Sequence, residues 1–147
     1  MPRQQEKRDR ELRSLDRISR VPRSAPASGF PSLMEGDPAA FAGLVRQYGV
    51  VMEMALERRA FKVEHKIPEE LHSLADLLGS LKAGPRDVVE IYKAALSEKT
   101  QGVPLQRAYA YLDEGRLLML ELMGYLASHY RDLCLRNRGR ADAAGAS

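Results

Sequence analysis

The residues whose types could do chemistry are few and widely spaced. The histidines are His65, His72 and His129, and the single cysteine is Cys134. Metal centres bring together several His, Cys or carboxylate ligands at short and regular spacing, which this pattern does not. A catalytic nucleophile needs a neighbouring base, and no motif in the sequence supplies that pair. We therefore expect no catalytic residue, no metal and no cofactor, and we predict that the chain is not an enzyme.

The carboxylates that are adjacent in sequence do not change this expectation. Glu69 precedes Glu70, and Asp113 precedes Glu114, each pair within a segment of helical pattern. Such pairs are usually solvated helix faces, although perturbed carboxylates do mark some active sites. The sequence also lacks a G-x-G-x-x-G motif and a P-loop, so nucleotide binding of either kind is not predicted.

The net charge of +3 is distributed unevenly along the 147 residues. Residues 1–24 are rich in Arg and contain more basic than acidic residues, so the rest of the chain is close to neutral. A basic arm of this kind can contact phosphates, but it lacks interleaved aromatic residues and contains several acids. Nucleic-acid binding is therefore an alternative, not the leading hypothesis. The lone cysteine, the absence of a long apolar run and the charged N-terminus favour a cytoplasmic protein with no membrane association.

Composition divides the chain into three parts. Residues 1–36 are predicted to be a basic disordered arm followed by a proline-rich linker, with only weak support for a short helix. Residues 37–136 are predicted to be one helical domain, and residues 137–147 a disordered tail. Apolar residues recur every three or four positions in the domain, which predicts helices over about 37–59, 67–83, 86–100 and 105–135. The expected fold is all-α, a four-helix bundle.

The last of these helices carries more apolar surface than one face can bury. Leu117, Leu118, Leu120 and Met123 widen its apolar stripe, and two glycines would allow another backbone to approach. Contacts within the chain could cover this surface, and so could a second copy of the chain. We favour a homodimer, with the interface at Gly115, Leu118, Met119, Leu122, Met123 and Gly124.

Residues 40–135 resemble a small helical family that contains the C-terminal domain of the clock protein KaiA and the N-terminal domain of the stress-response phosphatase RsbU. The entry to the third helix, Pro85-Arg86-Asp87-Val88, is similar to that of the family. The other matching residues are Val89-Glu90-Ile91-Tyr92, Ala95-Leu96-Ser97-Glu98, Glu114, Arg116-Leu117, Leu120-Glu121, Leu126 and Tyr130-Arg131.

The resemblance implies a dimerising four-helix unit with a non-catalytic task. In KaiA the domain binds a segment of the ATPase KaiC and promotes its autophosphorylation, whereas in RsbU it receives an activating switch kinase. Two residues depart from the pattern, because Tyr92 stands where both relatives tend to carry histidine and Tyr125 where KaiA does. Tyrosine keeps an aromatic face but does not titrate near neutral pH.

The leading hypothesis is a homodimeric regulator that binds a KaiC-like ATPase and modulates its phosphorylation, as in a circadian clock or related signalling. The alternatives are an RsbU-like adaptor for a switch kinase in a sigma-factor pathway, and a nucleic-acid-associated protein that uses the basic arm. Tyr and Arg are common anchors of protein interfaces. The candidate partner-binding residues are Glu90, Tyr92, Arg116, Glu121, Tyr125, Tyr130 and Arg131.

Overall fold

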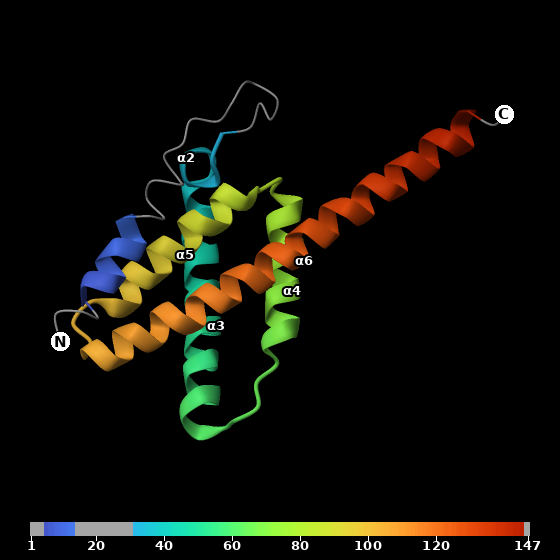
Figure 1. Cartoon of the computed structure of the whole chain (residues 1–147). Helices are drawn as coiled ribbons and strands as arrows, with labels where there is room; N and C mark the ends of the chain where they lie inside the picture. The colour runs from blue at the N-terminus through green and yellow to red at the C-terminus, as the bar shows by residue number, and fades with distance from the viewer. Residues whose placement is uncertain (1–4, 14–30, 146–147) are drawn as a thin grey trace.

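The computed structural model describes residues 5–13 and 31–145, and every regular element in these two ranges is a helix. The fold is therefore all-α, as the apolar periodicity predicts. The helices span residues 5–13, Leu33–Gly36 (α2), Pro38–Phe61 (α3), Ile67–Ser80 (α4), Pro85–Thr100 (α5) and Leu105–Gly145 (α6) (Figure 1).

The helix starts follow from local capping chemistry. The Asp37 carboxylate accepts a hydrogen bond from the Ala40 amide at 3.1 Å, and Pro38 occupies the first helical position of α3. At α5, the Asp87 carboxylate accepts from the Gly84 amide at 2.8 Å. Its second oxygen accepts from the Leu33 amide at 2.8 Å, so this buried side chain also ties α2 to α5. Both expected helix starts are confirmed.

The four longer helices form two crossed pairs. α3 packs beside α4, α5 packs beside α6, and α6 crosses both α3 and α4 (Figure 1). The core between the pairs is mostly aliphatic, with Tyr48 and Tyr92 fully buried in edge-to-face contact, their ring centroids 6.2 Å apart. α6 thus packs against all three of the other long helices.

α6 is closely packed where Gly115 faces Tyr92. A Cβ atom at position 115 would lie 2.8 Å from Cε2 of the Tyr92 ring, closer than side chains pack. The Tyr48 hydroxyl donates a short hydrogen bond to the Gly115 carbonyl oxygen, and the Tyr92 hydroxyl donates to the Leu112 carbonyl oxygen at 3.2 Å. The glycine therefore allows α5 and α3 to approach α6.

The predicted ends of the domain differ from the structure. Residues 5–13, placed in a disordered arm, form a helix that contacts α6, and the linker contains α2 at Leu33–Gly36. α6 continues to Gly145, so residues 137–145 are helical instead of a disordered tail. Arg and Ala have high helix propensity, and extending an existing helix needs no new nucleus. Residues 1–4, 14–30 and 146–147 lie outside the described residues.

Most residues of the predicted dimer interface are buried within the chain. Leu118, Met119 and Leu122 are buried in the core of the chain itself, and Gly115 is covered by Tyr92. Met123 is half-buried and Gly124 is exposed. The sequence pattern showed that α6 has more apolar residues than one face needs. The residues assigned to a second copy are instead covered by α3, α4 and α5, which all pack on α6. The apolar side chains that stay open on this part of α6 are Leu117 and Leu120, 61% and 59% exposed.

Candidate functional site

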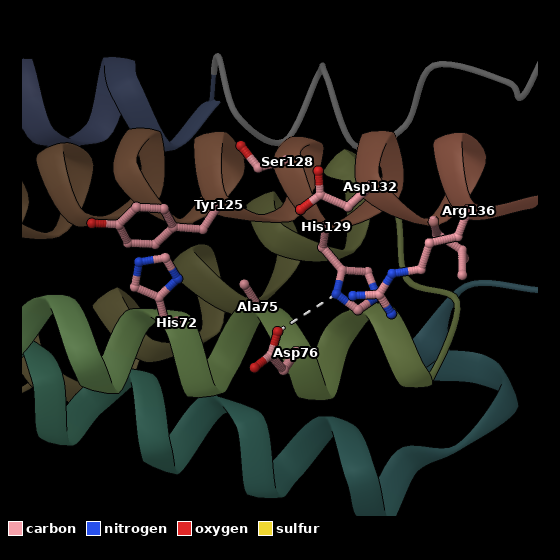
Figure 2. Close-up of a pocket in the computed structure, with 9 residues that line it drawn as sticks. His72, Ala75, Asp76, Tyr125, Ser128, His129, Asp132 and Arg136 are labelled. Atoms are coloured by element: carbon pink, nitrogen blue, oxygen red, sulfur yellow. Dashed lines mark ion pairs between the residues drawn. The ribbon is translucent and has the colours of Figure 1, made fainter. Parts of the chain in front are cut away.

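We take as the candidate site a groove between α4 and α6, with a volume of about 330 Å³, because aromatic, acidic and basic side chains of two helices line it together. We call it the α4–α6 groove. Figure 2 shows α4 along one side and α6 along the other, with the side chains of both helices between them. Its lining residues are His72, Ala75, Asp76, Tyr125, Ser128, His129, Asp132, Leu133 and Arg136.

An aromatic stack forms one end of the groove. The rings of His72 and Tyr125 lie nearly parallel, with centroids 3.8 Å apart and an interplanar angle of 18° (Figure 2). The Tyr125 hydroxyl donates to a Glu121 carboxylate oxygen at 2.7 Å. This hydrogen bond is the main cause that raises the pKa of Tyr125, so the hydroxyl stays protonated. The stack thus offers a flat, half-exposed apolar surface with a polar end.

His129 occupies the middle of the groove because Gly79 has no side chain. A Cβ atom at position 79 would overlap the His129 ring, which lies directly over α4. Nδ1 of His129 is 3.5 Å from Oδ1 of Asp76, and the Tyr130 ring packs edge-on at 5.7 Å between centroids. The Tyr130 hydroxyl donates to the Ala83 carbonyl oxygen at 2.6 Å, which holds this stretch of α6 against the end of α4.

The groove has groups that can bind a polar chain. The His129 ring points toward Asp76, whereas the Ser128 hydroxyl is directed away from that ring (Figure 2). No hydroxyl or thiol of a described residue is hydrogen-bonded to His72 or His129. No group of three His, Cys, Asp or Glu residues in the described ranges could hold a metal ion. The lining instead combines aromatic, acidic and basic side chains.

The predicted partner-binding residues fall into three regions. Tyr125 lines the groove, Glu121 is hydrogen-bonded to it, and Tyr130 anchors the α4 end. Arg131 is exposed and lies on another side of α6, with Cys134, Leu135, Asn137 and Arg138. The structure therefore brings Glu121, Tyr125 and Tyr130 together and leaves Arg131 apart.

The other three predicted residues lie on the α5–α6 side. Tyr92 is fully buried, so the prediction that it contacts a partner is wrong, and its role is in the core. Burial raises its pKa, and the nearby Glu11 carboxylate raises it further. Glu90 is 3.3 Å from Arg86 through one oxygen, while its other oxygen is buried without a hydrogen-bond partner among the described residues. Burial raises the pKa of the Glu90 carboxyl. Arg116 binds Glu11 at 3.1 Å.

Sequence reasoning missed His72, Asp76, His129 and Arg136 as groove residues. It treated the histidines as candidate metal ligands, and their spacing failed that test. A signal was present, however. His72 and Asp76 are four residues apart, as are Tyr125 and His129, so each pair shares a helix face. What the sequence could not show is that these two faces meet.

Two further observations complete the description. No helix in the described part of the chain combines the length and apolar character that crossing a membrane requires. Comparison with known proteins found no matching family model, no matching curated protein and no matching solved structure.

Proposed function

We propose that this chain is a non-catalytic regulatory protein that binds a segment of a KaiC-like ATPase in the α4–α6 groove and thereby modulates phosphorylation of the ATPase. The observation that carries the proposal is the groove itself. It is an open site that presents the His72–Tyr125 stack beside Asp76, His129 and Arg136. The nature of the partner comes from the resemblance of residues 40–135 to the KaiA and RsbU domains.

The size and lining of the groove suit a peptide segment. A volume of about 330 Å³ is at the small end of ligand pockets, enough for one or two side chains of a bound chain. The ring stack would contact an apolar or aromatic side chain, and aromatic residues often dominate the binding energy of an interface. Asp76 and Arg136 would bind polar groups of the segment at the rim.

A non-catalytic protein can still control an ATPase by binding one of its conformations. If the groove binds a segment that is free in one state and packed away in another, binding shifts the population toward the free state. The size of the shift is limited by the difference between the affinities for the two states. This mechanism requires no titrating or nucleophilic group in the groove.

The experiment combines the full chain with a KaiC-like ATPase from the same genome. Fluorescence anisotropy with a labelled C-terminal peptide of the ATPase measures binding, and the phosphorylated fraction measures regulation. Tyr125→Ala should weaken binding about tenfold or more, because it removes half of the stack. Val50→Ala, which trims another exposed apolar side chain, on α3, should leave binding unchanged. No complex, or equal effects of the two substitutions, would rule the proposal out.

The second candidate, an adaptor for a switch kinase, rests on the same resemblance and uses the same groove. Replacing the ATPase with a switch kinase from the same genome distinguishes the two. Binding through residues 1–24 to nucleic acid is less favoured. Two of the basic side chains of the described arm already have protein partners, since Lys7 contacts Tyr109 and Arg8 lies 3.7 Å from Asp9.

A homodimer remains part of the proposal, with a revised interface. The outer side of α6 exposes Leu117, Leu120 and Gly124 at spacings of three and four, and nothing lies within 4 Å of where a Gly124 Cβ would be. A second copy that packs there would bury both leucines. Sedimentation equilibrium should therefore report a dimer for the full chain and a monomer for the Leu117→Lys, Leu120→Lys double variant. A monomer for both proteins would remove the dimer.

A further inference from the structure

The helix at residues 5–13 is held on α6 by two side chains of opposite charge. Nζ of Lys7 donates to the Tyr109 hydroxyl at 2.7 Å and lies 4.9 Å from the centroid of that ring. Four residues later, both Glu11 carboxylate oxygens accept from Nη1 of Arg116, at 3.1 and 3.3 Å. Figure 1 shows this helix, in blue, beside α5 and the first part of α6.

The same helix also makes an apolar contact. Leu12 is half-buried and packs on the hydrophobic core, and the Glu11 side chain is only 17% exposed. Glu11 and Leu12 therefore face the rest of the chain, and Lys7, although exposed, reaches Tyr109 from the same helix. The receiving surface consists of Tyr109, Arg116 and the core residues beneath Leu12, and we call it the α5–α6 face.

One residue of the helix fits this face poorly. Nε of Arg8 is buried and has no hydrogen-bond partner among the described residues. A buried donor without a partner weakens the association, because it has lost its water and gained nothing in return. The Lys7–Tyr109 hydrogen bond is exposed, and Arg116 is 42% exposed in its ion pair with Glu11, so water weakens both contacts. The contacts therefore hold residues 5–13 in place but leave room for a helix that fits better.

We infer that the α5–α6 face is a second protein-binding surface, which takes an amphipathic helix from a partner protein and is occupied by residues 5–13 in the free chain. The partner helix would carry a Glu-Leu pair in the places of Glu11 and Leu12, and an apolar residue in the place of Arg8. Glu binds Arg116 and Leu packs on the core, as the chain's own segment demonstrates. The apolar residue would remove the unpartnered donor.

Competition is the physical consequence of this arrangement. A tethered segment acts at an effective concentration of roughly millimolar, so a free helix must bind the vacated face more tightly than the chain's own segment does. Loosening the chain's own segment should therefore raise the apparent affinity for any helix of the right pattern. The surface is separate from the α4–α6 groove, so this inference does not depend on the proposed function.

The test uses the full chain and a fluorescein-labelled synthetic peptide of residues 3–16 that carries Arg8→Leu. The Glu11→Lys protein, in which the chain's own segment is repelled by Arg116, should bind this peptide at least about tenfold more tightly than the wild-type protein. Lys7→Ala provides a second loosened protein that retains Glu11. Circular dichroism checks that both variants stay folded.

Charge reversal tests the register. Adding Arg116→Glu to Glu11→Lys should abolish binding of the peptide, because the new glutamate repels its Glu11 and also pairs again with the chain's own Lys at position 11. The single Arg116→Glu protein should bind a peptide that carries both Arg8→Leu and Glu11→Lys. Tyr125→Ala should leave all these affinities unchanged, which separates this surface from the groove.

Three outcomes would overturn the inference. The first is a peptide affinity that is equal for the wild-type and both loosened proteins. The second is no binding to any of them, which would make residues 5–13 a fixed part of the fold. The third is a Glu11→Lys protein that dimerises in sedimentation by exchanging its segments, because the natural occupant would then be a second copy of this chain.

Discussion

The α5–α6 side and the α4–α6 groove both contain a glycine that faces an aromatic ring, but the ring is buried on one side and partly exposed on the other. On one side, Gly115 of α6 makes room for the Tyr92 ring of α5; on the other, Gly79 of α4 makes room for the His129 ring of α6. Tyr92 is fully buried, whereas the His129 side chain is 30% exposed and faces Asp76. A glycine opposite a ring therefore allows close approach, and the surrounding elements decide whether the ring becomes core or site.

The difference also explains why similar tyrosines have different roles. Tyr92 and Tyr125 both lie on amphipathic helices, Tyr92 on α5 and Tyr125 on α6. Tyr92 is enclosed by α3 and α6, and its hydroxyl bonds a backbone carbonyl. Tyr125 stacks on a histidine of a helix that leaves one side open. The comparison can be tested by substitutions that are matched across the two regions.

The largest expected difference is between Tyr92→Ala and Tyr125→Ala. Removing a fully buried aromatic ring should lower the free energy of unfolding by about 3–5 kcal/mol, because it leaves a cavity. Tyr125→Ala removes a half-exposed ring and should lower it by no more than about 1 kcal/mol. Urea unfolding of both variants measures this difference. Similar losses for the two variants would show that the groove is as much a part of the core as Tyr92 is.

The second comparison uses two glycines of α6. Gly124→Ala should raise the free energy of unfolding by up to about 1 kcal/mol, because alanine favours helix and the position is open. Gly115→Ala gains the same propensity but forces Tyr92 and the tip of Met52 to move, and we expect a net loss of about 1–3 kcal/mol. Thermal unfolding gives both values. A stabilising Gly115→Ala would contradict the close packing seen at Tyr92.

A smaller effect, dependent on pH, is expected at Glu90. Burial raises the folded-state pKa of this carboxyl above 4.5. Its contribution to the free energy of unfolding is therefore fully present below that pH and is lost as the carboxyl ionises. Glu90→Gln cannot ionise. The free energy of unfolding of the variant should therefore exceed that of the wild type by an amount that increases from about pH 4 to about pH 7. This difference should stay below about 1 kcal/mol. Urea unfolding across this range measures it, and an advantage that shrinks as pH rises would show that the sign is wrong.

The smallest change in stability is expected for Gly79→Ala. The new methyl group would displace the His129 ring, whose far end can swing toward solvent. The cost of moving this ring should roughly offset the gain in helix propensity. The free energy of unfolding should therefore change by no more than about 0.5 kcal/mol. Partner binding in the groove should nevertheless fall, and the NMR signals of the His129 ring should shift. A large loss of stability without any shift at His129 would mean that the ring is not movable.

Much of the fold could be predicted from the sequence, because its signals are local. The cap at Asp37 and Pro38 and the apolar periodicity of α3 to α6 depend on residues within a few positions of one another. The groove depends on the crossing of α4 and α6, which brings His72 to Tyr125 across more than 50 positions of sequence. The contact of Glu11 with Arg116 is equally remote. The sequence patterns predicted the helices and some candidate binding residues, such as Tyr125, but not which helix faces pack together.

The errors at the two ends of the chain have a common physical origin. Residues 5–13 and 137–145 are too polar to predict a stable helix from their own pattern. The first gains its stability from Arg116, Tyr109 and the core beneath Leu12. The second gains it by continuing a helix that the core already stabilises. In both segments the decisive interaction lies outside the segment, so no reading of its own composition could have revealed it.

The length of α6 has a practical consequence for measurements of mass. Its 41 residues extend over roughly 60 Å, whereas a compact chain of this size has a radius of gyration of only about 15 Å. Its red C-terminal end projects well past the other helices in Figure 1. Such an elongated outline increases friction, so size-exclusion chromatography would overstate the molar mass and could make a single chain elute like two. Light scattering or equilibrium centrifugation, neither of which depends on shape in this way, is the appropriate measurement of subunit number.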